Sequence, residues 1–373
     1  MNQTLIRPTS SSRRGYNFAA GPAMLPESIL LKAQQAMLNW ANTGMSILEI
    51  NHRHPLFLNF MEEAECLLRS LLSVPDHYHV LFLTQPARMQ FSMIPMNFIH
   101  PAVQAGYIIS GMWSYEAYKE ANRLSNAYCI ATNQDSDFTV LPQLNAREIR
   151  DGTAYIYYAP NETVDGLRIA PPPFKEKHIP LIADMTSYLL SEPICVEDYA
   201  LIFAGIQKNI GPSGMTIVIV DDRLLKTIST TVPAMLDYRV HAEAHSLAAT
   251  PAVFQCYLAY LMFQWVNEQG GVNALYEKNR QKAEMLYHYI DSSDFYCCYV
   301  TGEGRSLMNV CFYLKDREKE AAFISEAEKL GLYGLQGHRR KGGIRVSLYN
   351  PMPIEGVYAL IDFMKAFALS HAC

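Results

Sequence analysis

A lysine between two apolar stretches is the first feature that suggests chemistry. In the segment AGIQKNIGPSG, residues 204–214, an apolar stretch ends at Ala204 and Lys208 follows in a Gly/Pro-rich turn. Lysine side chains prefer water. In a closed site the pKa of a lysine falls, and its amine can form a Schiff base with a carbonyl compound. The alternative interpretation is an exposed loop lysine whose aliphatic stem packs on a sheet.

An aspartate earlier in the chain favours the chemical interpretation. Asp184 follows the apolar residues 181–183 and precedes Thr186 and Ser187. At the carboxyl end of a parallel strand a carboxylate faces the crevice where ligands bind, although it could instead cap a helix. An aspartate followed one strand later by a lysine is what pyridoxal phosphate requires. The aspartate keeps the pyridine nitrogen protonated, and the lysine holds the aldehyde.

The elements that must position these residues alternate between strands and helices. Several stretches are apolar throughout and do not alternate between apolar and polar residues, as expected of strands covered on both faces. The predicted strands are residues 80–83, 107–110, 154–158, 181–183, 200–204, 216–220, 308–314 and 344–349. The predicted helices are residues 26–42, 55–72, 114–124, 251–268, 272–292, 318–330 and 354–367.

This order predicts an α/β fold with a large domain around a mostly parallel central sheet and a smaller C-terminal α+β domain. We place the large domain at residues 16–270 and the small domain at residues 271–373. Residues 1–15, MNQTLIRPTSSSRRG, are predicted to be a disordered leader.

Composition excludes several classes of protein. The chain has 373 residues, half of them hydrophobic, which rules out a small disulfide-stapled scaffold and a disordered polyelectrolyte. Its 31 basic and 36 acidic residues give a net charge of −5, which argues against nucleic-acid binding. The eight cysteines show no metal-ligand spacing, so no metal site and a reducing, cytoplasmic location are expected. No apolar run is long enough to cross a membrane.

Six motifs together carry a family resemblance. They are YNFAAGPAMLP, INHRHPLF, PNETVDGL, ADMTSYLLS, AGIQKNIGPSGMTIVIV and HRRKGGIRVSLYN. With these motifs the chain resembles the phosphoserine aminotransferases, which belong to class V of the fold-type-I pyridoxal phosphate enzymes. The resemblance runs from Tyr16 to Val357 and so covers nearly the whole chain.

The resemblance implies a cofactor site for pyridoxal 5'-phosphate. Lys208 would carry the cofactor as a Schiff base, Asp184 would pair with its ring nitrogen and Trp113 would stack on its ring. The other implied cofactor residues are Thr163, through its hydroxyl, and Ala87, Arg88, Gln207 and Thr250 around the phosphate. Taken alone, Trp113 could be core packing, and the turn that contains Thr163 could be an ordinary Asx cap.

The resemblance also implies a substrate and a reaction. Arginine grips carboxylates and phosphates with paired donors, and the implied substrate residues are His52, Arg53, Arg88, His338, Arg339 and Arg345. Some of them would come from a neighbouring subunit, which implies a homodimer. The reaction would exchange an amino group between glutamate/2-oxoglutarate and 3-phosphohydroxypyruvate/O-phospho-L-serine in serine biosynthesis. The family also accepts 4-phosphohydroxy-L-threonine in vitamin B6 synthesis. Without the resemblance, GHRRKGG would be a solvated basic turn.

Three residues depart from the family at the expected phosphate site. Pro86 has no N–H to donate, Met89 is bulky where a small residue is common, and Ala249 replaces an asparagine that reaches the phosphate across the dimer. A catalytically weakened or non-catalytic paralogue with a binding or regulatory role is therefore the alternative. A lyase or desulfurase is a further one, but a desulfurase needs a mobile cysteine and no cysteine lies in a Gly/Ser-rich loop.

Overall fold

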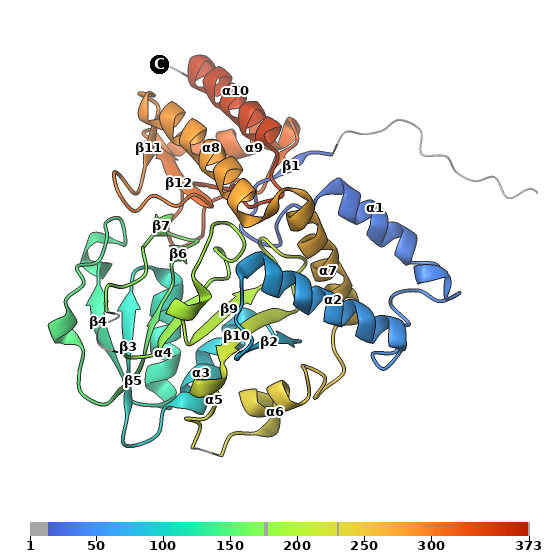
Figure 1. The fold of residues 1–373 in the computed structure, drawn as a ribbon. Coiled ribbons are helices and arrows are strands. Elements are labelled where there is room, and N and C mark those ends of the chain that lie inside the picture. The colour runs from blue at the N-terminus through green and yellow to red at the C-terminus, as the bar shows by residue number, and fades with distance from the viewer. Residues whose placement is uncertain (1–13, 175–177, 230, 372–373) are drawn as a thin grey trace, which may run out of the picture.

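The computed structural model describes residues 14–174, 178–229 and 231–371 (Figure 1), so residues 1–13 of the predicted leader lie outside the described residues. The helices are α1 (Glu27–Ala36), α2 (Pro55–Leu72), α3 (Gln90–Phe98), α4 (Met112–Leu124), α5 (Asp222–Leu225), α6 (Tyr238–Glu243), α7 (Val253–Glu268), α8 (Gly271–Asp291), α9 (Glu320–Lys329) and α10 (Ile354–Ser370).

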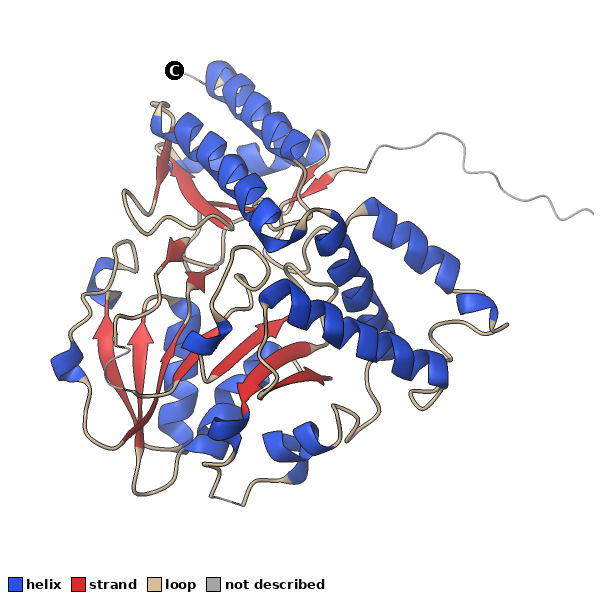
Figure 2. Cartoon of the chain, viewed as in Figure 1, coloured by secondary structure: helices blue, strands red, loops and turns tan. Residues whose placement is uncertain are grey.

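The strands are short, and half of those in the described residues belong to one sheet (Figure 2). They are β1 (Tyr16–Asn17), β2 (Tyr78–Leu83), β3 (Gln104–Ile109), β4 (Ala127–Thr132), β5 (Thr153–Tyr158), β6 (Asn161–Glu162), β7 (Leu167–Arg168), β8 (Leu181–Asp184), β9 (Leu201–Gly205), β10 (Thr216–Asp221), β11 (Tyr296–Cys298), β12 (Asn309–Leu314), β13 (Leu332–Tyr333) and β14 (Ile344–Ser347).

The central sheet has seven strands in the order β2-β10-β9-β8-β5-β3-β4. Strand β10 is antiparallel to both of its neighbours, β2 and β9. The pairings among β9, β8, β5, β3 and β4 are parallel. Because β10 separates β2 from β9, these two strands run in the same direction. The predicted α/β fold with a mostly parallel central sheet is confirmed.

Helices cover both faces of this sheet, which explains why its strands are apolar without alternation. On one face Phe82 belongs to a core with Phe57 of α2 and Leu258 of α7. On the other face the next strand residue, Leu83, belongs to a second core with Ile94 of α3 and Ala117 of α4. The sheet is therefore a rigid middle layer from whose edges turns can present side chains.

The C-terminal part has a core of its own. Helices α8 and α10 pack on the three-stranded sheet β11-β12-β14, with Leu286, Phe312 and Leu360 in its centre. Phe18 from the start of the chain also lies in this core, and β1 pairs in parallel with β13. Residues near the N-terminus thus extend into the C-terminal layer. The division at residue 270 remains a prediction.

The helix predicted at residues 26–42 is wrong in its second half. Helix α1 ends at Ala36, and residues 40–42 form a separate 3-10 turn in which Ala41 has a left-handed φ of 48°. The turn buries Trp40, whose ring lies 5.7 Å from Phe60 and 6.1 Å from Tyr257. Packing of this aromatic side chain has overridden the local helical pattern.

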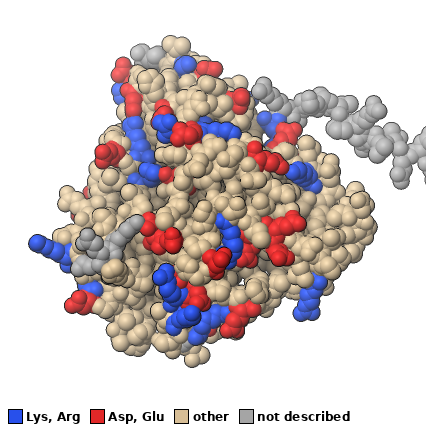
Figure 3. Space-filling model, viewed as in Figure 1, with Lys and Arg blue, Asp and Glu red and all other residues tan. Residues whose placement is uncertain are grey.

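Charged side chains of both signs are mixed on the face drawn in Figure 3. This matches the mild net charge and shows no continuous basic surface on that face. Across the described ranges, no helix is long and apolar enough to span a membrane.

Candidate active site

Lys208 lies in the turn after β9, at the carboxyl edge of the sheet. The turn is closed by backbone bonds from Ile206 N to Met215 O (3.1 Å) and from Gly211 N to Ile206 O (2.7 Å). The lysine is only 7% exposed, and its Nζ donates to the Thr163 hydroxyl at 2.5 Å. Burial lowers the pKa of this amine to about 8, although the Asp184 carboxylate opposes the shift. The alternative of an exposed loop lysine is excluded.

Asp184 ends the neighbouring strand β8, so both residues reach the same edge of the sheet. The side chain is buried, and Oδ1 accepts a hydrogen bond from Thr186 N at 2.9 Å. Burial raises the pKa of this carboxyl, while the Thr186 bonds and the Lys208 amine act in the opposite direction. A buried carboxylate with one oxygen held in place is suited to pairing with a protonated ring nitrogen.

A cavity of about 290 Å³ lies in front of these two side chains. Most of the predicted cofactor residues line it, namely Ala87, Arg88, Trp113, Thr163, Asp184, Gln207 and Lys208. They arrive from the ends of five strands of the sheet, β2, β3, β5, β8 and β9. The carboxyl edge of a parallel sheet is where ligands are expected to bind.

Two features of the cavity fit a flat, phosphorylated cofactor. The indole Nε1 of Trp113 is buried without a hydrogen-bond partner among the described residues. Ala87 and Arg88, which also line the cavity, begin a 3-10 turn, so their amides precede the first intrahelical bond. A Cβ on Gly205 would lie 2.9 Å from the Ala87 Cβ and 2.5 Å from Gln207 Oε1, so glycine is needed for these groups to approach one another.

The predicted substrate residues are less closely gathered. None of His52, Arg53, His338, Arg339 and Arg345 lines the cavity formed by the described residues. His52 and Arg53 lie in the turn before α2.

Arg345 is half-buried on β14, and its Nε has no partner among the described residues. It is close enough to help lower the pKa of Lys208. The side chain of Arg88 is 64% exposed and pairs with Glu116 at 3.1 Å.

The residues that depart from the family are placed as follows. Pro86 precedes the 3-10 turn and lines the cavity, while Met89 ends the turn and is 37% exposed. The missing N–H of Pro86 lies before the turn, so the amides of Ala87 and Arg88 remain available. Ala249 and Thr250 are exposed, and Thr250 does not line the cavity.

Two buried carboxylates at this site were missed by the sequence reasoning. Glu162 accepts from the amides of Trp113 (2.9 Å) and Ser114 (2.8 Å), and Asp165 accepts from Met112 N at 3.0 Å. Together they satisfy the first amides of α4 and so fix the helix that carries Trp113. Their only sequence signal was that both lie in the motif PNETVDGL.

Comparison with known proteins decides the family. Residues 15–360 match the aminotransferase class-V family. The chain belongs to this family. It is 52% identical to a phosphoserine aminotransferase of Legionella pneumophila (strain Paris), covering 95% of this chain and 98% of the relative. It is 45% identical to that of Laribacter hongkongensis, covering 95% of this chain and 99% of the relative.

Solved structures agree with the fold. The phosphoserine aminotransferase from Bacillus circulans subsp. alkalophilus superposes with a TM-score of 0.93 at 39% identity, covering 97% of this chain and all of that one. A pyridoxal phosphate-bound phosphoserine aminotransferase from Trichomonas vaginalis gives 0.88 at 36% identity, covering 94% of this chain and 100% of that chain. The predicted fold type and membership of the phosphoserine aminotransferase family are confirmed.

Proposed function

We propose that this class-V aminotransferase uses pyridoxal 5'-phosphate to exchange an amino group between glutamate/2-oxoglutarate and 3-phosphohydroxypyruvate/O-phospho-L-serine in serine biosynthesis. The observation that carries the proposal is the buried Lys208 amine, which faces the cavity beside Thr163 while Asp184 ends the adjacent strand. The 52% identity to a phosphoserine aminotransferase supports this choice of substrates.

The cofactor supplies an aldehyde that takes up the amino group and a ring that accepts electrons from the substrate α-carbon. Lys208 would hold the cofactor covalently and, once displaced by substrate, move the α-proton. Its pKa of about 8 suits that task, because an amine with a pKa near neutrality can both accept and return a proton. Asp184 would keep the ring nitrogen protonated, and Trp113 would cover one face of the ring.

The substrate's anions require arginines. Arg345, with its unpartnered Nε, would bind the α-carboxylate. His338, Arg339 and Arg88 would surround the phosphate or the distal carboxylate. His52 and Arg53, which do not line the cavity of their own chain, would be supplied by a second copy in a homodimer. The same anion-binding groups would also admit 4-phosphohydroxy-L-threonine in vitamin B6 synthesis.

A cytoplasmic location is also proposed. Its support is that every cysteine in the described part of the chain is a free thiol, as expected in a reducing compartment.

A visible spectrum tests the proposal. The purified protein with added pyridoxal phosphate should show the yellow band of lysine-bound cofactor, which glutamate bleaches and 3-phosphohydroxypyruvate restores. Lys208→Ala should abolish the band, whereas Lys226→Ala, which removes an exposed lysine, should leave it unchanged. A protein that stays colourless at high cofactor concentration would exclude catalysis.

The residues that depart from the family make one alternative testable, namely a weakened or non-catalytic paralogue. Pro86, Met89 and Ala249 depart from the family at the expected phosphate site, so a non-catalytic paralogue would bind the cofactor weakly and show no band. A weakened enzyme would show the band only at higher cofactor concentration. Because the cavity formed by the described residues has no cysteine in its lining, it gives a desulfurase no support.

A further inference from the structure

The basic loop of the HRRKGG motif contains a lysine that the proposed reaction does not use. Residues 337–343 form a closed turn, in which Gly337 N donates to Gly343 O (2.8 Å) and Lys341 N donates to His338 O (2.8 Å). A Cβ on Gly337 would lie 2.0 Å from Gly342 O, so only glycine allows this closure. The turn is therefore held together by its own backbone bonds, so an anchor at one of its residues also positions His338 and Arg339.

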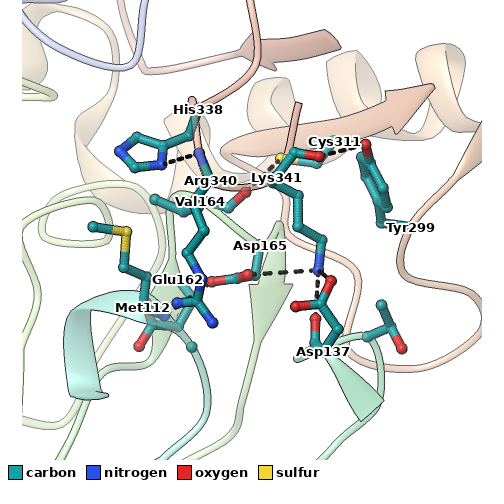
Figure 4. Close-up of polar contacts among 12 residues, drawn as sticks. Met112, Asp137, Glu162, Val164, Asp165, Tyr299, Cys311, His338, Arg340 and Lys341 are labelled. Atoms are coloured by element: carbon teal, nitrogen blue, oxygen red, sulfur yellow. Dashed lines mark hydrogen bonds and ion pairs between the residues drawn. The ribbon is translucent and has the colours of Figure 1, made fainter. Parts of the chain in front are cut away.

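Lys341 is that anchor. Although it belongs to a loop, its side chain is only 4% exposed. Its Nζ lies 2.8 Å from Asp137 Oδ2 and 3.7 Å from Asp165 Oδ1, and it also donates to the main-chain carbonyl of Asp137 (Figure 4). The Tyr299 hydroxyl donates to the Lys341 carbonyl at 3.1 Å. The ammonium is thus held between two carboxylates of the large sheet's loops.

One of these carboxylates also binds the start of α4, the helix that carries Trp113. Asp165 is 1% exposed, and its other oxygen accepts from Met112 N at 3.0 Å, one residue before Trp113. Its Oδ1 has no hydrogen-bond partner in the described residues, and the Lys341 ammonium, followed by the Arg340 guanidinium, compensates its charge. A buried carboxylate without a nearby cation would be costly.

Arg340 makes different contacts from Lys341, although its charge also acts to lower the pKa of the Asp165 carboxyl. Its guanidinium lies 5.1 Å from the centre of the Phe138 ring, and its amide donates to His338 Nδ1 at 3.3 Å. Two neighbouring cations of the loop therefore have different surroundings, one stacked at the surface and one buried between carboxylates. The buried cation, Lys341, connects the loop to Asp137 and Asp165.

We propose that Lys341 is a positioning residue, which fixes the loop that carries His338 and Arg339 to the start of α4 through Asp165. The proposal rests on the proposed function, because it assumes that those two side chains bind the substrate's phosphate. Lys341 does not line the cavity formed by the described residues. Its effect is on substrate affinity, and the chemistry at Lys208 does not depend on it.

Lys341→Met tests this by removing the charge while keeping much of the length. We expect the KM for 3-phosphohydroxypyruvate to rise about tenfold with kcat changed by less than about twofold, because a displaced loop weakens binding before it affects chemistry. The yellow band should be unchanged. Lys341→Arg should restore most of the affinity, and Lys315→Met, at an exposed lysine 3.7 Å from Asp294, is the matched control.

A second variant guards against misfolding. Asp137→Asn removes the more exposed carboxylate and leaves Asp165 with its cation, so a smaller rise in KM of about threefold is expected. An unchanged KM in Lys341→Met, or an equal loss of kcat, overturns the proposal. Turnover of the unaltered protein tests the proposed function separately: if it fails with every phosphorylated acceptor, the function itself is wrong.

Discussion

Burial of the Lys208 amine has a kinetic consequence. Only the neutral amine attacks an aldehyde, and burial brings the pKa of this group to about 8 from 10.5. The rate at which the cofactor-free protein captures pyridoxal phosphate should therefore rise with pH through about 8 and level off above it. Stopped-flow absorbance between pH 6.5 and 9.5 measures this.

The Asp184→Asn variant supplies the control for that profile. The carboxylate raises the pKa of the lysine, so its removal should move the midpoint to lower pH. A rate that keeps rising about tenfold per pH unit up to pH 9.5 in the unaltered protein would contradict the lowered pKa, because an amine with a pKa of 10.5 would still be mostly protonated there.

Glu162 predicts a pH-dependent stability. Burial, with help from Asp165, raises the pKa of its carboxyl to about 7 from 4.5. Between these values the folded state holds a proton that the unfolded state has lost, so the free energy of unfolding falls as pH rises from 4.5 through 7. Integrated over that window, the loss is on the order of 2 to 3 kcal/mol.

Urea titrations at pH 5, 6 and 7 can isolate this contribution. Glu162→Gln cannot ionise, so the stability difference between unaltered protein and variant should shrink as pH rises. Glu120→Gln, on the partly exposed side of α4, is the control and should shift all three values equally. A constant difference for Glu162→Gln would rule out the proposed proton uptake.

A buried amine on helix α8 binds the segment that leads into α10. Lys282 is 3% exposed and donates to the carbonyls of Leu348 (3.1 Å), Tyr349 (3.1 Å) and Met352 (3.0 Å). Lys282→Met leaves these three acceptors unsatisfied, and we expect it to lower the free energy of unfolding by about 2 to 3 kcal/mol. Chemical denaturation measures the change.

The matched control lies one turn earlier on the same helix. Lys278 is exposed and bonds only to Gln269 Oε1, at 2.9 Å, among the described residues. Lys278→Met should change stability by less than about 0.5 kcal/mol. Equal effects of the two substitutions would show that the three carbonyl bonds contribute nothing specific.

Helices and strands could be predicted where residues in the segment itself mark its start and end. Helix α2 was predicted to the residue, since Pro55 starts it and Ser73 ends it in a left-handed conformation. Helix α3 was missed; it has Pro95 inside it, where a sequence pattern favours a break. Strand β4 was missed too, because its short apolar run is no longer than many helix segments.

The same limit applies to the site. Lys208 and Asp184 could be found because each follows an apolar strand. The ion pairs of Lys341 join residues far apart in the chain, and its bond to the Asp137 carbonyl spans 204 positions. Nothing local in the sequence indicates such a pairing.

For the whole molecule, the proposed homodimer predicts complementation between inactive variants. Lys208→Ala and Arg53→Ala should each be nearly inactive. If Arg53 acts on the neighbouring subunit's cavity, random mixing by refolding should restore about a quarter of the normal activity, because half the dimers then contain one intact site of two. Activity assays on the mixed sample measure this.

A second mixture controls for nonspecific rescue. Lys208 and Asp184 line the same cavity of one chain, so Lys208→Ala mixed with Asp184→Asn leaves a defect in every site and should stay inactive. Failure of the first mixture, together with a monomeric mass in solution, would refute a shared site.

The reversed strand β10 also governs when the pocket can form during synthesis. Strand β2 lies at the edge of the sheet, and its neighbour there is β10; Thr216 Oγ1 donates to Gln85 O at 2.7 Å across 131 positions of sequence. A nascent chain that has just delivered Lys208 therefore still lacks the strand that supports the turn at residues 86–89. Until β10 leaves the ribosome, β2 and β9 both keep an open edge, so the earliest moment of cofactor capture is set by the last strand of the sheet to be made.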